Sequence, residues 1–217
     1  MVLESHNEQY SMIYDYLGEI RKSNPGSTTI LMLDNKVFLR MYICLQACKE
    51  GYKAGCRHVL SIDGCHLKGY YRDIFLAAIA VDANDNTYPI AYVVVKVENQ
   101  SSWSWFLSLL GTDLEIGNFD NITILSDKQK EFEDTMAELK ALSVSTFDWL
   151  KGKDTAQWSK SHFSLRSKCN MLLSNLSECF NKMILYARYK PILTFTEMVR
   201  TKIMQKISIK RKRQKSG

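Results

Sequence analysis

Two aspartates follow short apolar runs that have the composition of β-strands. Asp63 comes directly after the run 58–62 and precedes Gly64, while Asp127 follows the run 122–125 with one serine between them. A carboxylate at the end of a strand can ligate a divalent cation. On residue type alone, however, Asp63 can also be a turn residue before glycine, and Asp127 can also be the N-cap of a following helix. Both alternatives stay open at this point.

Thiol and imidazole groups offer a second kind of chemistry, because they are the usual ligands of zinc. The chain has six cysteines and four histidines. Several of them gather in the segment 44–66, namely Cys44, Cys48, Cys56, His58, Cys65 and His66. Their spacing does not match the paired CxxC or CxxC with HxxxH arrangements of zinc sites. We therefore expect buried or half-buried free thiols here.

Positive charge is concentrated at the C-terminal end of the chain. The net charge is +6, but residues 1–150 hold 13 Lys/Arg and 20 Asp/Glu, whereas residues 151–217 hold 16 and 3. A segment this basic favours contact with a polyanion, most simply nucleic acid. The tail 206–215 fits either a nuclear localisation signal or an arm that contacts phosphates, and its alternative is a solvated C-terminus.

The composition is that of a soluble globular protein, with 46% hydrophobic and 24% charged residues. No apolar run approaches the roughly 18 residues that a membrane span needs, so we expect no membrane partner. The first residues lack the basic and apolar regions of a secretory signal. These features predict an intracellular protein.

The N-terminal part combines helical and extended patterns. Residues 6–22 have apolar side chains at helical spacing, and the breaker sequence 24–27 ends that helix. Residues 28–33 have the composition of a short strand. The run 37–48 fits a strand or a helix, and we favour a helix because apolar residues recur every three or four positions, at Phe38, Met41, Leu45 and Cys48.

The middle of the chain has the strongest pattern. Strands are predicted at 58–62, 74–81 and 88–97, then a helix capped by Ser101 or Ser102, then a strand at 122–125. The second and third strands should form a hairpin. This β-β-β-α-β order is the opening of an RNase H-like mixed sheet of the α/β (α+β) class. In that fold the first and fourth strands are neighbours, so Asp63 and Asp127 should approach each other.

The remainder is predicted to be helical. Patterns at 131–142, 169–187 and 194–207 are amphipathic, and Pro191 separates the last two. We therefore divide the chain into four parts. They are an N-terminal helical flanking region (1–54), a partial RNase H-like core (55–130), a C-terminal helical region (131–207) and a basic disordered tail (208–217).

Five segments in order carry a specific resemblance. They read NPGST (24–28), GCRHVLSIDGCHLKGYY (55–71), NTYPIAYVVVKVENQSSWSWFLSLL (86–110), ITILSDKQK (122–130) and, over 158–200, a segment that starts WSKSHFSLRSKCNMLLSNLSECFNK. As an ordered set they resemble the catalytic region of plant Mutator-like element (MULE) transposases, over most of residues 24–200.

The resemblance implies a DDE-type transposase on an RNase H-like fold, in which three carboxylates hold two divalent ions, normally Mg²⁺ (or Mn²⁺). Asp63 in the Ile-Asp-Gly motif matches the first acid of the family. Asp127 in Leu-Ser-Asp matches the second, and Glu178 in Leu-Ser-Glu-Cys-Phe-Asn matches the third. Glu178 can alternatively be a solvated glutamate. Lys68, just past the first acid, is a candidate for contact with DNA phosphate, together with the basic tail residues Lys210, Arg211, Lys212 and Arg213.

The chain departs from the family pattern after Lys130. Family members continue with a helix, another strand and a short Cys/His motif. Here the segment that starts at Glu131 already resembles a later part of the family, its helical insertion. A truncation after the fourth strand should leave that strand at an unpaired edge. We expect Asp63 and Asp127 to converge and Glu178 to be displaced. The N-terminal DNA-binding domain and C-terminal zinc module of longer members also have no counterpart here.

Three functional readings follow. The first is a protein whose ancestral activity is DNA strand cleavage and transfer at transposon ends, and in which the internal deletion impairs that activity. The alternatives are a domesticated, non-catalytic DNA-associated regulatory protein and a non-functional transposon remnant. In each case the implied partner is DNA and the implied location is the nucleus. The resemblance also allows a homo-oligomer.

Overall fold

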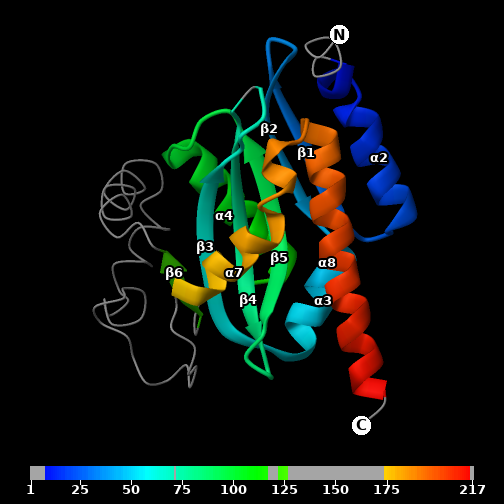
Figure 1. Cartoon of the computed structure of the whole chain (residues 1–217), viewed down its shortest axis with the longest axis vertical. Helices are drawn as coiled ribbons and strands as arrows, with labels where there is room; N and C mark the ends of the chain where they lie inside the picture. The colour runs from blue at the N-terminus through cyan, green and yellow to red at the C-terminus, as the bar shows by residue number, and fades with distance from the viewer. Residues whose placement is uncertain (1–7, 71, 117–121, 127–173, 216–217) are drawn as a thin grey trace.

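Six strands form one mixed sheet in the computed structural model of the chain (Figure 1). The structure describes residues 8–70, 72–116, 122–126 and 174–215, with the side chains of all of these except 126, 174–178 and 210–215. Helices pack on both faces of the sheet, which confirms the predicted mixture of helices and strands.

The order of strands across the sheet is β1-β2-β5-β4-β3-β6. All neighbours are antiparallel except β3 and β6, which are parallel. The strands are β1 (Thr28–Asp34), β2 (Val37–Cys44), β3 (Cys56–His66), β4 (Ile74–Asp82), β5 (Thr87–Val95) and β6 (Thr123–Ser126). The predicted hairpin of the second and third core strands is confirmed by the β4–β5 pairing, and the predicted adjacency of the first and fourth by the β3–β6 pairing. Among the described strands β6 lies at an edge, and whether a truncation leaves that edge unpaired stays a prediction.

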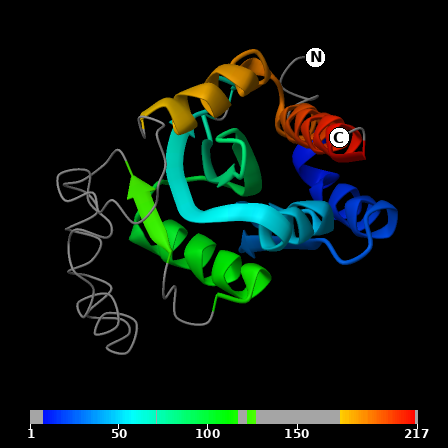
Figure 2. The same cartoon turned by 90° about the horizontal axis from the view of Figure 1, so that it is seen from below.

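Helices lie on both faces of the sheet. The described elements are α2 (Ile13–Ser23), α3 (Gln46–Gly55), α4 (Gln100–Leu114), α7 (Ser174–Ile184), the 3-10 turn η4 (Ala187–Tyr189) and α8 (Ile192–Lys215). Figure 2 shows α4 on one face of the sheet and α7 with α8 on the other. α2 lies beside α8, and the Tyr16 hydroxyl donates to Glu197 across them at 2.8 Å. Among the described helices, none is long and apolar enough to cross a membrane.

The predicted helix over 37–48 is wrong. Residues 37–44 form β2, which pairs with β1 on one side and with β5 on the other. Only after Leu45 does the chain become helical, in α3. The last four residues of β2 are all buried, because a central strand covered on both faces needs apolar side chains at successive positions. Such a run contains apolar residues at helical spacing by necessity.

Two further boundaries differ from prediction. The N-cap of α4 is Asn99, whose side-chain oxygen accepts from the Ser102 amide at 2.9 Å, and not Ser101 or Ser102. At the other end of the chain α8 runs to Lys215, so the tail predicted to be disordered from 208 continues this helix through Lys215. The predicted helix at 131–142 lies outside the described residues.

One part of the core lies between the sheet and the α7–α8 layer, and another part includes Phe106 and Leu110 of α4. Phe75 on β4 is 1% exposed. Its ring stacks on Phe180 of α7 at 6.0 Å between centroids and meets Phe195 of α8 edge-on at 5.1 Å. Burial of aromatic rings of this size contributes a few kcal/mol each. The C-terminal helices are therefore part of the same hydrophobic core as the sheet.

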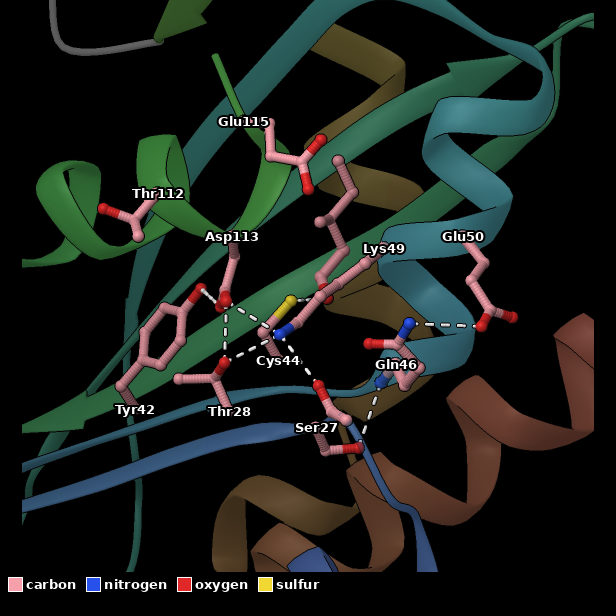
Figure 3. A network of polar contacts seen from close by, with 12 residues as sticks. Ser27, Thr28, Tyr42, Cys44, Gln46, Lys49, Glu50, Thr112, Asp113 and Glu115 are labelled. Atoms are coloured by element: carbon pink, nitrogen blue, oxygen red, sulfur yellow. Dashed lines mark hydrogen bonds and ion pairs between the residues drawn. The ribbon is translucent and has the colours of Figure 1, made fainter. Parts of the chain in front are cut away.

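A buried ion pair joins the opposite layer (Figure 3). The Lys49 ammonium of α3 lies 2.8 Å from the Asp113 carboxylate near the end of α4. That carboxylate also accepts from the hydroxyls of Thr28 at 2.6 Å and Tyr42 at 2.7 Å. Four elements (β1, β2, α3 and α4) thus meet at one carboxylate, whose charge is compensated and hydrogen-bonded as a buried charge requires.

Candidate functional site

Asp63 lies near the end of β3, where the strand leaves the core. Residues 59–62 of β3 are buried, whereas Asp63 is half-buried. Its Oδ1 accepts from the Gly64 amide at 2.8 Å, and its Oδ2 accepts from the Asn181 side-chain amide of α7 at 2.7 Å. The carboxylate is thus oriented by two donors, one of them from a residue far along the chain.

The strand beside Asp63 is β6. The two strands are parallel, and their ladder pairs Ile62 with Ser126. Asp63 is the residue after Ile62, and Asp127 is the residue after Ser126 in the sequence. Asp127 itself lies outside the described residues, so the structure leaves the predicted convergence of the two aspartates untested.

α7 is the element that carries the predicted third acid. The helix packs on the sheet through Phe180, which is 2% exposed and stacks on Phe75 of β4, and it reaches β3 through the Asn181–Asp63 hydrogen bond. Residues three apart on a helix share a face, so position 178 lies on the face of α7 that includes Asn181. The side chain of Glu178 lies outside the described ones, and its predicted displacement stays a prediction.

The sheet separates Asp63 from another nearby carboxylate. Successive residues of a strand point to opposite faces, so position 64 faces away from Asp63. A Cβ built on Gly64 would lie 2.9 Å from Leu76 Cδ2 and 3.0 Å from Glu98 Oε1, and this crowding explains the glycine after the aspartate. Glu98 accepts from the Trp103 indole at 3.2 Å. It therefore belongs to the α4 side of the sheet.

The end of β3 is anchored by a residue beyond α7. Arg188 donates from Nε at 3.0 Å and from Nη2 at 2.6 Å to the carbonyl of His66, the last residue of β3. The backbone amide of Lys68 donates in turn to the Arg188 carbonyl at 2.7 Å. These bonds fix the turn after β3 against η4.

Lys68, the predicted contact to DNA phosphate, is exposed. Its ammonium lies 3.2 Å from the Tyr189 hydroxyl and 5.3 Å from the centroid of that ring. The other predicted basic residues, Lys210 to Arg213, lie on the last turns of α8, and their side chains are outside the described ones. Contact of Lys68 or of these other cations with DNA phosphate therefore stays a prediction.

Four of the five described cysteines are packing groups. Cys44 and Cys48 are buried, Cys56 and Cys65 are half-buried, and Cys179 is exposed. Burial raises the pKa of the Cys48 thiol to about 12 and that of Cys65 to about 11, so both stay protonated at neutral pH. The expectation of buried or half-buried thiols is confirmed for the four cysteines of 44–66. Within the described ranges no three His, Cys, Asp or Glu side chains gather as a metal cluster.

Sequence reasoning did not single out Asn181, Arg188, Tyr186 or Tyr189 as functional. One signal was present for Asn181, because it stands three positions after Glu178 and therefore on the same helical face. The others carry no sequence signal. Arg188 and Tyr189 contact residues 66–68 across more than a hundred positions, and Tyr186 is distinguished by its exposure.

The comparison with protein families adds one finding. Residues 59–141 match the family model described as the MULE transposase domain. The match covers β3 to β6, the segment in which Asp63 and Asp127 stand. No curated protein and no solved structure matches the chain. The family match supports a MULE-type transposase as the relative of this chain.

Proposed function

We propose that this chain is a protein derived from a DDE-type Mutator-like transposase. In this proposal the sheet β5-β4-β3-β6 with α4 is an RNase H-like core, and Asp63, Asp127 and Glu178 are its metal-binding carboxylates. The single observation that carries the proposal is the hydrogen bond between Asp63 and Asn181. It brings the helix that includes position 178 against the strand that includes Asp63.

Two further observations support the arrangement. The parallel pairing of β3 and β6 aligns Ile62 with Ser126, and each of these residues directly precedes one of the aspartates. The family match also covers this pair of strands. The three acids are thus attached, through the backbone, to three elements that pack together.

The residue types suit a hard divalent cation. Carboxylate oxygens are the ligands that Mg²⁺ takes, and Asp63 presents such a group at the end of a strand, half-buried and held by donors on both oxygens. Two bound ions, when present in such a site, stabilise both the attacking and the leaving oxygen of a phosphodiester displacement. The part that this chain's own residues perform is orientation, in which Asn181 and the Gly64 amide set the plane of the Asp63 carboxylate.

We propose that strand cleavage itself is impaired in this chain. The family pattern continues after the fourth strand with another strand and a Cys/His motif that have no counterpart in residues 131–157. Metal catalysis requires the ligands to be held within about 0.5 Å of the productive geometry, and a shortened connection before α7 changes how Glu178 is placed. What persists is a folded, basic protein with DNA as its partner.

The metal site is tested by Mn²⁺ binding to the full chain, measured by titration calorimetry. We expect wild-type protein to bind Mn²⁺ and Asp63→Asn to weaken binding at least about tenfold, since the loss of a charged ligand removes a direct bond to the ion. The matched control is Asp34→Asn, which neutralises an exposed aspartate at the end of β1 and should leave Mn²⁺ affinity unchanged. Equal effects of the two substitutions, or no binding at all, would overturn the metal site.

The activity assay then separates the functional readings. Labelled transposon-end DNA with Mg²⁺ or Mn²⁺ should remain uncleaved, and Asp63-dependent nicking would show that the chain is an active enzyme. Salt-sensitive DNA binding without nicking fits a DNA-associated regulatory role, which the basic C-terminal segment favours. A chain that fails to unfold cooperatively in urea would instead be a remnant.

We propose the nucleus as the location. The basic end of α8 includes Lys210, Arg211, Lys212 and Arg213. A fluorescent fusion of the full chain should accumulate in the nucleus, and changing these four residues to glutamine should redistribute it through the cell. The control changes Lys22 and Lys53, which lie on other helices, and should leave the fusion nuclear. A wild-type fusion that stays in the cytoplasm would contradict the proposal.

A further inference from the structure

Two exposed tyrosines and three cations meet at the turn after the strand of Asp63. The tyrosines are Tyr186, 68% exposed, and Tyr189, 56% exposed. The cations are Lys68, Arg188 and Lys190. We name these five residues the tyrosine–lysine surface. Exposed aromatic side chains that gather in one place, unlike singly exposed ones, mark candidate interaction sites.

The backbone puts the two rings on one side. Tyr186 is the N-cap of the 3-10 turn η4 and Tyr189 is its last residue. Residues three apart in a 3-10 helix are eclipsed, so positions 186 and 189 lie on the same side of the turn. The turn is fixed to the sheet by Arg188, which donates twice to the His66 carbonyl. The rings are therefore presented from a rigid support.

Each ring has a lysine ammonium against it. The Lys68 ammonium is 5.3 Å from the centroid of Tyr189, and the Lys190 ammonium is 4.6 Å from that of Tyr186. Gly69 packs close to the same turn, because a Cβ there would lie 3.3 Å from the Lys190 carbonyl. Aromatic faces alternate here with positive charges at short range.

We propose that the tyrosine–lysine surface binds single-stranded DNA, with the tyrosines stacking on unpaired bases and the lysines contacting phosphates. Alternating aromatic and basic side chains are the arrangement that recognises single strands without sequence readout. A duplex offers no free base faces to these rings. The phosphate charge is complementary to Lys68, Arg188 and Lys190.

The location fits a role beside the proposed site. β3 runs from Asp63 directly to His66, and the surface begins two residues later at Lys68. A single strand stacked on these tyrosines would therefore lie beyond the end of the strand that includes Asp63. The proposal rests on DNA as the partner under the proposed function, but it needs no metal ion.

Binding is measured by fluorescence anisotropy of a labelled single-stranded oligonucleotide of about 12 nucleotides, with EDTA present. The full chain is compared with the double variant Tyr186→Ala/Tyr189→Ala. We expect the double variant to bind roughly 10- to 100-fold more weakly, because each lost stacking contact weakens affinity severalfold or more. Duplex DNA of the same length should lose less than about threefold, since its binding is mainly electrostatic.

Two control variants sharpen the result. Tyr186→Phe/Tyr189→Phe keeps the ring faces and should retain affinity within about threefold. Tyr14→Ala removes a tyrosine of similar exposure, 69%, on α2, and should have no effect. The proposal is overturned if the alanine variant behaves like Tyr14→Ala, if duplex and single strand are weakened equally, or if the wild type binds no single strand. Because EDTA removes divalent ions, failure of the metal site alone cannot produce any of these outcomes.

Discussion

Replacing Asp113 by asparagine is expected to lower the free energy of unfolding by about 3 kcal/mol. The substitution leaves the shape of the side chain nearly unchanged but removes the negative charge. Lys49 then keeps an ammonium that is only 12% exposed without its counter-charge. Breaking one partner of a buried ion pair typically costs about 3–5 kcal/mol, and the hydroxyls of Thr28 and Tyr42 lose a charged acceptor as well.

The chain provides a matched control on the same helix end. Glu115 pairs with Lys53 at 2.6 Å, but its side chain is 77% exposed. Glu115→Gln should therefore cost less than about 1 kcal/mol, as exposed ion pairs do. Both variants are compared with wild type by urea denaturation. If Asp113→Asn costs no more than Glu115→Gln, the network of Figure 3 does not stabilise the fold in the way that its burial indicates.

A second substitution, Phe180→Ala, should lower the free energy of unfolding by roughly 3–5 kcal/mol. Phe180 is 2% exposed and stacks on Phe75 at 6.0 Å between centroids. Truncating a buried phenylalanine removes its transfer free energy and leaves a cavity, and the two effects together reach this range. The substitution also removes the apolar contact that holds α7 against the sheet.

The effect is again measured by urea denaturation, and Leu185→Ala is the control. Leu185 follows α7 directly and is 50% exposed, so its loss should cost less than about 1 kcal/mol. A similar small cost for Phe180→Ala would mean that α7 is not docked on β4 in solution. The Asn181–Asp63 contact would then lose its structural support.

Much of the sheet could be predicted from the sequence because its strands are bounded by strong turn signals. The run 74–81 ends at Asp82, whose carboxylate accepts from the amides of Asn84 and Asn86, so the hairpin of β4 and β5 follows from local chemistry. The pairing of β3 with β6 followed from element order alone. The turn signal at Asp82 acts through neighbouring residues and does not depend on the rest of the molecule.

The run 37–44 could not be assigned in the same way. Its apolar residues fit a period of 2 and a period near 3.6 equally well, since a strand buried on both faces has no polar alternation. What decides the outcome is the presence of β1 and β5 on either side of Met41, which pairs with Leu31 and with Val94. β1 directly precedes β2, but β5 comes from about fifty positions further along, and a short window of sequence does not contain it.

The residues of the candidate site also fall into two groups, those that local sequence indicates and those that only tertiary packing brings together. Asp63 could be found because an acid before glycine ends a strand pattern, and its position on β3 follows from that pattern. Its hydrogen bond to Asn181 joins residues 118 positions apart, and the tyrosines of η4 become recognisable only through their exposure. Partners that meet through tertiary packing leave no periodic trace in the sequence.

The contact between α2 and α8 has a consequence for how the chain reaches its final form. Tyr16 and Glu197 are separated by 181 positions, and Gln9 accepts from the Leu193 amide across 184. During synthesis, the first helix emerges from the ribosome long before its companion exists. Docking of α2 on α8 therefore waits until residues 192–197 have been made, and the long sequence separation slows it. Until then the apolar sheet surface that α8 covers stays exposed, and such surface favours aggregation.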